Sequence, residues 1–387
     1  MKKKIAILGS TGSIGKTLFN ILLKEQNNCE VLLLTAHKSH KVLLKQAKVL
    51  NVKNLIITNK KDYEILKDKT KKTKIRVFNN FKKLDKIFKK KIDYVMSSIS
   101  GIKGLEPTVK IIEFTKKIAI ANKESIICGW NLIQAKLKKN NTEFIPVDSE
   151  HFSIWYGLKN FKKNNLEKVI LTASGGPFYN TTVDNFKRIK VSDALKHPNW
   201  SMGKKISTDS ATMINKVFEV MEARKVFDID YKKIKILIHP KSYIHAILKF
   251  NNGLTKIIVH DTTMKVPIFN TLFLNDNRKL KTNKININIL NNLNLKNVNP
   301  AQFPMTKLLN LVPDNHSLFE TVVVAANDKL VELFLNNKIK FTDIQKNLFK
   351  IIKKKEFQKF KKKLPLNIKD ITSLNDYVRL KIDENNI

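Results

Sequence analysis

The chain contains little cysteine and no long apolar run. Only Cys29 and Cys128 are present, and they form no Cys-x-x-Cys or other metal-binding spacing, which excludes a disulfide framework and is typical of a reducing cytoplasm. No apolar run reaches the length of a membrane span, and the apolar residues that follow the first lysines are too few for a signal peptide. We therefore expect a cytoplasmic protein with no membrane partner.

Acidic residues and arginine are also scarce. The 33 Asp and Glu residues stand against 73 Lys and Arg residues, which gives a formal net charge of +40. Nucleic-acid-binding proteins rely on Arg for bidentate contacts and stacking, but nearly every basic residue here is Lys. Lys, Asn and Ile are abundant throughout, as AT-rich codons would produce. We expect no nucleic-acid partner. The alternative outside the enzymes is a nucleic-acid-binding or degenerate scaffold protein, which would need no intact cluster of acidic residues.

The order of apolar and polar segments predicts an α/β protein. From Ile5 to Val147 short apolar strands alternate with helical segments, as in a doubly wound parallel sheet. Strands expected at 236–239 and 244–250 run antiparallel through a turn at 240–242, and from Ala301 the pattern is helical. We predict an N-terminal Rossmann-like domain, a central α+β catalytic domain and a C-terminal α-helical domain. The predicted boundaries are 1–150 for dinucleotide binding, 151–274 for catalysis and dimerisation, 275–300 for a linker and 301–387 for the helical domain.

Three glycines follow the first strand. Gly9, Gly12 and Gly15 lie between strand 5–8 and a helix, a position in which backbone N–H groups approach a pyrophosphate. About twenty residues later, NAD-binding proteins place an Asp or Glu for the ribose. Here the segment is His37, Lys38 and Ser39, with a cation in place of a carboxylate. This favours the 2′-phosphate of NADP, although a basic loop residue without function is the alternative in so lysine-rich a chain.

Polar side chains follow two later strands. Asn122 to Ser125 follow strand 118–121, and Asp148 and Glu150 follow strand 144–147. Two carboxylates at this spacing suit a hard divalent cation such as Mg²⁺ or Mn²⁺, with a third oxygen ligand from elsewhere. The alternative is a helix cap, because residues 152–158 have a helical pattern. His151 alone is more often a satisfied polar residue than a ligand.

The stretch from His197 to Glu219 combines a loop with a helix. Asp209 and Ser210 are expected to cap a helix. On this helix Asn215 and Glu219 share one face, and Lys216 lies within reach of Glu219. A helix start with a serine and a lysine suits a phosphate. The alternative is an amphipathic helix with a solvated polar face. Trp200 lies in the preceding Pro- and Gly-bounded loop, and we expect it to belong to a lid.

Several of these segments resemble the 1-deoxy-D-xylulose 5-phosphate reductoisomerase family, whose members use NADPH in the non-mevalonate isoprenoid pathway. The matching stretches follow the family's order over most of the chain: GSTGSIG (Gly9–Gly15), ANKES (Ala121–Ser125), PVDSEH (Pro146–His151), SGGPF (Ser174–Phe178), HPNWSMG (His197–Gly203), DSATM (Asp209–Met213) and IHPKSYIH (Ile238–His245). Ser39 departs from the family's more usual Asn.

The resemblance implies an enzyme that rearranges and reduces 1-deoxy-D-xylulose 5-phosphate to 2-C-methyl-D-erythritol 4-phosphate. It implies NADPH, Mg²⁺ or Mn²⁺ (with Co²⁺ as a further candidate), a homodimer and a flap at 194–204. The catalytic residues would be Lys123, Asp148, Glu150 and Glu219, of which the three carboxylates hold the metal. The substrate contacts would be Lys123, Ser149, Glu150, Ser174, His197, Trp200, Met202, Ser210, Asn215, Lys216 and Glu219. The cofactor contacts would be Thr11, Gly12, Ser13, Ile14, His37, Lys38, Ser39, Asn122, Glu124 and Gly203.

A different NADP-linked dehydrogenase of a small phosphorylated or carbonyl substrate is the alternative within enzymes. A semialdehyde dehydrogenase, for example, needs a nucleophilic cysteine in a reactive loop. Cys29 lies just before an expected strand and Cys128 lies in an apolar setting. Neither position suits that role.

Overall fold

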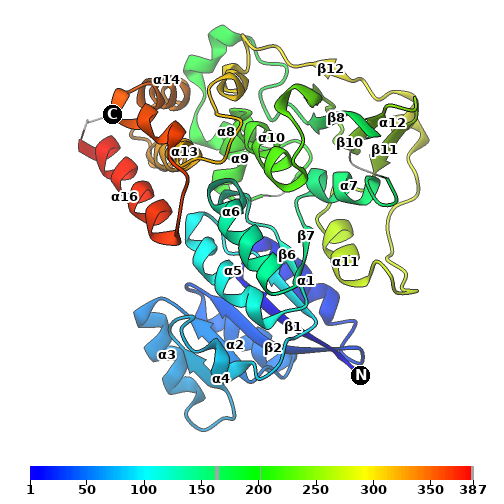
Figure 1. Ribbon diagram of the computed structural model, residues 1–387, viewed down its shortest axis with the longest axis vertical. Helices are drawn as coiled ribbons and strands as arrows, with labels where there is room; N and C mark the ends of the chain where they lie inside the picture. Colours follow the sequence, from blue (N-terminus) through cyan, green and yellow to red (C-terminus); the bar gives the residue numbers. More distant parts are fainter. Residues whose placement is uncertain (162–164, 201, 385–387) are drawn as a thin grey trace. The chain divides into compact units, whose positions relative to one another are not determined.

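The computed structural model describes residues 1–161, 165–200 and 202–384, and the chain divides into two compact units (Figure 1). Unit 1 comprises Met1–Ser125, Leu132–Asp148 and Met264–Leu280, and unit 2 comprises Ile126–Asn131, Ser149–Thr263 and Lys281–Ile387. Each unit is built on a β-sheet of its own. Within the described residues, no helix has both the length and the apolar character needed to cross a membrane.

Unit 1 contains a seven-stranded parallel sheet with the order β4-β3-β2-β1-β5-β6-β7. Strands β3 and β5 are buried at every residue, because a parallel sheet covered on both faces needs continuous apolar runs. The predicted doubly wound sheet is confirmed. The strands are β1 (Lys3–Leu8), β2 (Cys29–Ala36), β3 (Asn54–Ile57), β4 (Arg76–Phe78), β5 (Tyr94–Ser97), β6 (Lys117–Ile120) and β7 (Glu143–Pro146). The accompanying helices are α1 (Ser13–Leu22), α2 (His40–Val49), α3 (Lys60–Thr70), α4 (Leu84–Ile87), α5 (Leu105–Ile111), α6 (Lys123–Lys139) and α11 (Lys265–Phe273).

The order of strands reverses at β1, which lies between β2 and β5. Leu8 pairs with Ser97, Ser97 pairs with Ile120, and Ile120 pairs with Pro146. The loops that follow β1, β5, β6 and β7 therefore leave the sheet at one edge. In open α/β sheets, ligands bind at this edge and at the point of reversal.

Unit 2 contains a five-stranded mixed sheet with the order β11-β10-β8-β9-β12. Strands β8 and β9 are parallel, while β10 pairs antiparallel with both β8 and β11. Side chains of α7 and α10 pack on this sheet in one apolar cluster, which includes Ile154, Val220 and Leu171. The strands are β8 (Leu166–Ala173), β9 (Ile234–Ile238), β10 (Ile244–Phe250), β11 (Thr255–Val259) and β12 (Lys296–Asn297).

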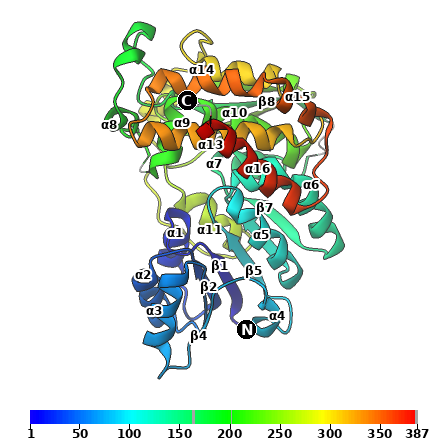
Figure 2. The ribbon, with the colours of Figure 1, turned by 90° about the vertical axis from the view of Figure 1, so that its left-hand side faces the viewer.

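The helices of unit 2 include the predicted C-terminal helical group. Helix α13 packs against α9, α14 and α16, as both ribbon views show (Figures 1 and 2). This arrangement confirms the helical segment expected after Ala301. The helices are α7 (Ser149–Gly157), α8 (Val191–Ala194), α9 (Lys204–Ala211), α10 (Ile214–Phe227), α12 (Ile287–Asn291), α13 (Phe319–Leu335), α14 (Phe341–Ile352), α15 (Lys355–Gln358) and α16 (Ile368–Glu384).

The predicted helix cap at Asp209 and Ser210 is wrong. Both residues lie in the last turn of α9, and a separate helix, α10, begins at Ile214. The two helices are divided by Met213, whose φ of 68° places it in the left-handed region. An isolated left-handed residue ends one helix and redirects the next, and no periodic pattern in the sequence marks it.

Three further expectations differ in detail. Strands β9 and β10 are antiparallel in direction but do not pair, because β8 lies between them. The expected linker 275–300 contains α12 and also β12, which pairs with β9. Helix α11, expected in the central segment, belongs to unit 1, where Ile268, Phe269 and Phe273 join its core. The division into four segments stays a prediction.

Candidate active site

The glycine turn lies at the point where the strand order of unit 1 reverses. Gly9 has a φ of 83°, and a Cβ there would lie 2.8 Å from the carbonyl oxygen of Ser98, so only glycine fits. A Cβ at Gly15 would lie 2.4 Å from the carbonyl oxygen of Gly9. Gly12 then caps α1, whose first residues are Ser13 and Ile14, with Thr11 on the turn before it. The turn thus presents a helix N-terminus with close backbone access, which suits a pyrophosphate.

The segment predicted to select NADP follows β2. His37, Lys38 and Ser39 are exposed, and the His37 Nδ1 atom lies 2.8 Å from the Thr58 hydroxyl. Ser39 has a φ of 67°, a left-handed conformation in which Asn is more common than Ser. The charged side chain of Lys38 is therefore exposed to solvent just after the end of β2.

The start of α6 holds three of the predicted residues. Asn122 caps α6 by accepting a hydrogen bond from the Ser125 N–H at 2.9 Å, and its amide donates to the Gly101 carbonyl at 2.7 Å. The Asn122 side chain therefore has a structural task. Lys123 and Glu124 are buried, and the Lys123 Nζ atom lies 2.9 Å from the Asp148 carboxylate. Lys123 and Asp148, which follow neighbouring strands at the same sheet edge, therefore form an ion pair.

Three predicted metal ligands come together. One carboxylate oxygen from each of Asp148, Glu150 and Glu219 lies within 4.8 Å of the others. Asp148 and Glu150 flank Ser149 on the turn into α7, while Glu219 is contributed by α10. An all-oxygen donor set with excess negative charge fits a hard divalent cation. A second such group, Asp148, His151 and Glu222, shares one carboxylate with the first.

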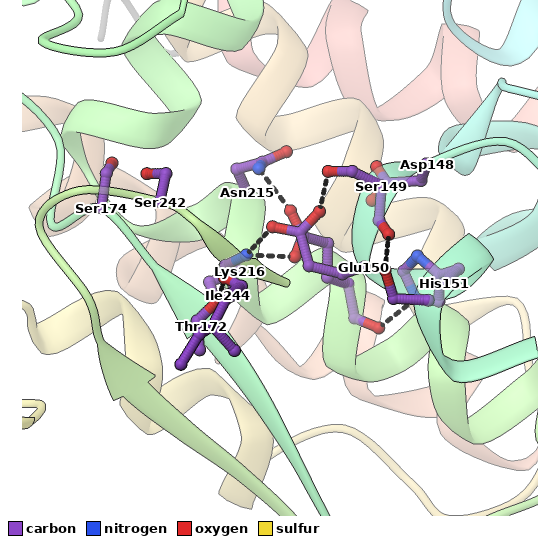
Figure 3. Close-up of polar contacts among 12 residues, drawn as sticks. Asp148, Ser149, Glu150, His151, Thr172, Ser174, Asn215, Lys216, Ser242 and Ile244 are labelled. Atoms are coloured by element: carbon purple, nitrogen blue, oxygen red, sulfur yellow. Dashed lines mark hydrogen bonds and ion pairs between the residues drawn. The ribbon is translucent and has the colours of Figure 1, made fainter. Parts of the chain in front are cut away.

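Lys216 contacts two of these carboxylates. Its Nζ atom lies 2.6 Å from Glu150 and also contacts Glu219, and Figure 3 shows it directed at Glu150. Burial opposes the charge on Lys216, but Glu150 and Glu219 outweigh burial and hold the pKa of the ammonium above its usual value. The Asn215 amide donates to Glu219 at 2.6 Å, and the Ser149 hydroxyl donates to Glu150. The acidic group already accepts a cation, which supports its fit to a metal ion.

His151 is fully buried, and its Nε2 atom lies 2.8 Å from the backbone carbonyl of Glu219. Its Nδ1 atom lies 3.5 Å from the Glu222 carboxylate. His151 thus has polar groups near both ring nitrogens, and it also belongs to the second group of possible metal ligands. Through these contacts it ties α7, which carries Glu150, to α10, which carries Glu219.

Ser174 and His197 form the second part of the site. The His197 Nδ1 atom accepts hydrogen bonds from the backbone N–H groups of Asn199 and Trp200, at 3.2 and 3.0 Å. The proton of the neutral ring is therefore on Nε2, which donates to the Ser174 hydroxyl at 3.0 Å. That hydroxyl also accepts from the Gly176 N–H at 3.0 Å, so its own hydrogen is left for a ligand. Burial, and then the charge of Lys216, lowers the pKa of His197 to about 4.

The glycine turn after β8 also contacts the end of α9. Gly176 has a φ of 66°, and a Cβ there would lie 2.9 Å from the carbonyl oxygen of Ser210. The turn that carries Ser174 therefore lies directly against Ser210, which is also predicted to bind the phosphate. Ser210 itself is half-buried, as are Ser174 and Asn215. Ser174 and Ser210 carry hydroxyl groups and Asn215 an amide, and the charge of Lys216 acts on His197, the partner of Ser174. Donors and positive charge of this kind suit a phosphate.

The predicted flap lies between α8 and α9. Trp200 is half-buried, and its ring meets the edge of His245 at 6.2 Å between centroids. Met202 is half-buried and Gly203 is exposed, while residue 201 of the predicted flap lies outside the described residues. The Asn199 amide donates to the Pro240 carbonyl at 2.6 Å and to the Ser242 hydroxyl at 2.9 Å.

Sequence reasoning did not select Ser242 as a site residue. It is buried, has a φ of 50°, and its side chain lies near that of Ser174 in Figure 3. The only sequence signal for Ser242 is the turn Pro240–Ser242, which the strand pattern predicts simply as a connection between strands. A serine held in a left-handed conformation beside a predicted phosphate residue is itself a candidate for that site.

The parallel sheet is of a dinucleotide-binding type, the carboxylate group suits a divalent cation, and the donor set suits a phosphate. Together these features define an oxidoreductase-like enzyme that acts on a phosphorylated substrate. Family models described as 1-deoxy-D-xylulose 5-phosphate reductoisomerase, its C-terminal domain, and the DXP reductoisomerase C-terminal domain match residues 5–129, 144–227 and 260–381. The chain belongs to the 1-deoxy-D-xylulose 5-phosphate reductoisomerase family.

Individual relatives support this assignment. The chain is 60% identical to the 1-deoxy-D-xylulose 5-phosphate reductoisomerase of Pelagibacter ubique (strain HTCC1062), over 98% of both chains. It is 37% identical to that of Wolbachia pipientis subsp. Culex pipiens (strain wPip), over 97% of this chain and 94% of the relative. A Zymomonas mobilis reductoisomerase solved with NADPH has a TM-score of 0.87 at 28% identity, covering 98% of each chain. A reductoisomerase solved with NADPH, fosmidomycin and magnesium has a TM-score of 0.89 at 28% identity, covering 99% of this chain and 98% of the other.

Proposed function

We propose that this protein catalyses the rearrangement and NADPH-dependent reduction of 1-deoxy-D-xylulose 5-phosphate to 2-C-methyl-D-erythritol 4-phosphate, a step towards isoprenoid precursors. The observation that carries the proposal is the arrangement on α10. Asn215 and Lys216 both donate to Glu219, and Glu219 on the same helix joins the metal-type carboxylates. One helix would therefore hold the phosphate anchor and a metal ligand in fixed register.

Asp148, Glu150 and Glu219 would hold Mg²⁺ or Mn²⁺, with Co²⁺ as a further candidate. When bound, the cation supplies Lewis-acid polarisation of the substrate's carbonyl and hydroxyl oxygens. Bound at the glycine turn of unit 1, NADPH supplies the hydride. Thr11, Gly12, Ser13 and Ile14 lie on that turn, and we propose the same cofactor role for His37, Lys38, Ser39, Asn122, Glu124 and Gly203.

The chain's own residues would bind and orient the substrate. Lys123 and Ser149 lie beside the carboxylates and are placed to contact the sugar hydroxyls. Ser174, His197, Ser210, Asn215 and Lys216 would bind the phosphate, which anchors the substrate away from the reacting carbons. Trp200 and Met202 would close over it, and a closed flap excludes water and retains an aldehyde until it is reduced.

The alternative dehydrogenase mechanism finds no support in the thiols. Cys29 and Cys128 are both buried. Burial, with Glu25 as a second cause, raises the pKa of Cys29 to about 11, and burial likewise raises the pKa of Cys128. A buried thiol with a raised pKa supplies almost no thiolate near neutral pH.

We further propose a homodimer in a reducing cytoplasm, with no nucleic-acid or membrane partner. Strand β11 is at an edge of the sheet of unit 2, and Ile257 on it is exposed. An exposed edge strand with apolar side chains is a template for pairing with another chain. Two buried, unpaired cysteines are compatible with a reducing compartment.

The experiment is an assay of NADPH oxidation that depends on 1-deoxy-D-xylulose 5-phosphate, with and without EDTA and with NADH in place of NADPH. We expect activity that EDTA abolishes, added Mg²⁺ restores and fosmidomycin inhibits. Because no carboxylate follows β2, NADPH should be the better substrate. Equal catalytic efficiency with both cofactors would overturn the cofactor assignment, and the absence of substrate-dependent oxidation would overturn the function.

A further inference from the structure

A buried polar pair joins α9 to α13. Asp209 and Asn327 are 118 residues apart, and the Asn327 amide donates to the Asp209 carboxylate at 2.9 Å. Asp209 is 2% exposed and Asn327 is fully buried. Lys205 lies 3.1 Å from Asp209 and 2.9 Å from Asp328, so it also connects the two helices. A carboxylate buried this deeply needs its donors, because water cannot replace them.

Asp209 connects in turn to the start of α10. Its backbone carbonyl accepts a hydrogen bond from the Thr212 hydroxyl at 3.2 Å, and that hydroxyl accepts from the Ile214 N–H at 3.4 Å. Between them Met213 takes the left-handed conformation that separates the two helices. The side chain of Asn327 is thus linked, through Asp209 and Thr212, to the first residue of the helix that carries Asn215, Lys216 and Glu219.

The same pair fixes the residue next to Asp209. Ser210 follows it directly in the last turn of α9, and the Ser210 carbonyl lies where a Cβ at Gly176 would clash, at 2.9 Å. A shift of Asp209 would therefore move Ser210 against the glycine turn that carries Ser174. Neither Ser210 nor the glycine turn can shift far towards the other without a clash. The packing of α9 on α13 therefore sets the geometry of the glycine turn that carries Ser174.

We propose that Asn327 is a positioning residue for phosphate binding: its hydrogen bond to Asp209 holds the junction of α9 and α10, and with it Ser210, Asn215 and Lys216, in register with Ser174. This inference rests on the proposed function, in which these residues bind the substrate's phosphate. It assigns to the C-terminal helical group a part in the site, although Asn327 itself is not placed against substrate.

The test uses the full-length enzyme with Asn327→Leu, which keeps the volume of the side chain but removes the donor. We expect fosmidomycin to bind roughly tenfold more weakly, since a hydrogen bond to a charged group is lost, and KM for the phosphorylated substrate to rise similarly. NADPH affinity, for which all proposed contacts except Gly203 lie in unit 1, should change much less. Asn327→Asp should be worse than Asn327→Leu, because it opposes two carboxylates in a buried site.

The exchange Asp209→Asn with Asn327→Asp restores an amide–carboxylate pair and should recover most of the fosmidomycin affinity lost in Asn327→Asp. A matched control is Thr321→Val, which removes a buried hydroxyl of α13 that interacts with Cys128 and should leave KM unchanged. The proposal is overturned if folded Asn327→Leu keeps KM and fosmidomycin affinity within about twofold of the wild type, or if the exchange restores nothing. A wild-type enzyme without substrate-dependent activity would instead overturn the proposed function.

Discussion

The ammonium nitrogen of Lys216 lies 2.6 Å from a carboxylate oxygen of Glu150, 66 residues away in the chain. The same ammonium contacts Glu219. One buried cation therefore compensates two of the three carboxylates that are proposed to hold the metal. Because the proposed phosphate contact uses this same group, metal binding and phosphate binding are expected to be linked through Lys216.

Lys216→Ala should have opposite effects on the two ligands. Without a competing ammonium, the carboxylates should bind Mg²⁺ more tightly in the absence of substrate. Fosmidomycin, in contrast, should bind more weakly by about 1.5–3 kcal/mol, through loss of a charge-assisted contact. Isothermal titration with Mg²⁺ alone and with fosmidomycin measures both effects. Lys204→Ala, at an exposed position of α9, is the control, and equal affinities in wild type and Lys216→Ala would contradict the linkage.

Removal of one metal ligand should abolish activity without unfolding the protein. In Glu219→Gln or Asp148→Asn, two carboxylates should hold the cation too weakly to act. Turnover at low Mg²⁺ and thermal melting by circular dichroism test the two parts of this prediction. Glu222→Gln separates the two candidate groups, since it should leave Mg²⁺ affinity intact if Glu219 is the ligand. Near-normal turnover of Glu219→Gln at low Mg²⁺ would show that this assignment is wrong.

Trp200→Ala should impair ligand binding and turnover far more than stability. The ring is half-buried in the flap, whereas a core Trp replaced by Ala costs about 3–5 kcal/mol. Trp130, which is buried in α6, provides the matched control, and Trp130→Ala should lower the melting temperature strongly. Trp fluorescence should change when fosmidomycin and Mg²⁺ are added, against a background from Trp130 and Trp155. A large loss of stability in Trp200→Ala with unchanged ligand affinity would identify Trp200 as a core residue.

His197 should make stability depend on pH. Burial, and then the charge of Lys216, lowers its pKa from 6.5 to about 4 in the folded protein. Between these values the unfolded state binds more protons than the folded state, so the free energy of unfolding falls as the pH falls from 6.5 towards 4. The contribution is fully present above pH 6.5. In His197→Asn, the loss of stability between pH 7 and pH 5 should be smaller than in the wild type.

Urea unfolding at the two pH values measures this difference, and the Asn side chain can still accept from the flap backbone. Burial also lowers the pKa of His239, His260 and His316, so the variant should reduce the pH dependence without removing it. An identical loss of stability in both proteins would mean that His197 titrates at its ordinary pKa.

The sequence determined much of the architecture by itself. The strand–helix alternation predicted the parallel sheet of unit 1, and the three glycines marked the turn at its point of reversal. These are local signals, since apolar periodicity and the conformational needs of glycine act over a few residues. Asp148 and Glu150 could be paired for the same reason, because they flank a single residue at a strand end.

Only the tertiary structure decided how distant segments meet. It replaced the predicted cap at Asp209 with a helix break at Met213, and it placed α11 in unit 1. It also showed that Asp209 is bound by Asn327, and that the Ser174 turn lies against Ser210. Such contacts join residues far apart in the chain through side-chain packing and buried hydrogen bonds. They leave no periodic trace in the sequence, because the free energy that favours them arises only when the folded chain removes both partners from water.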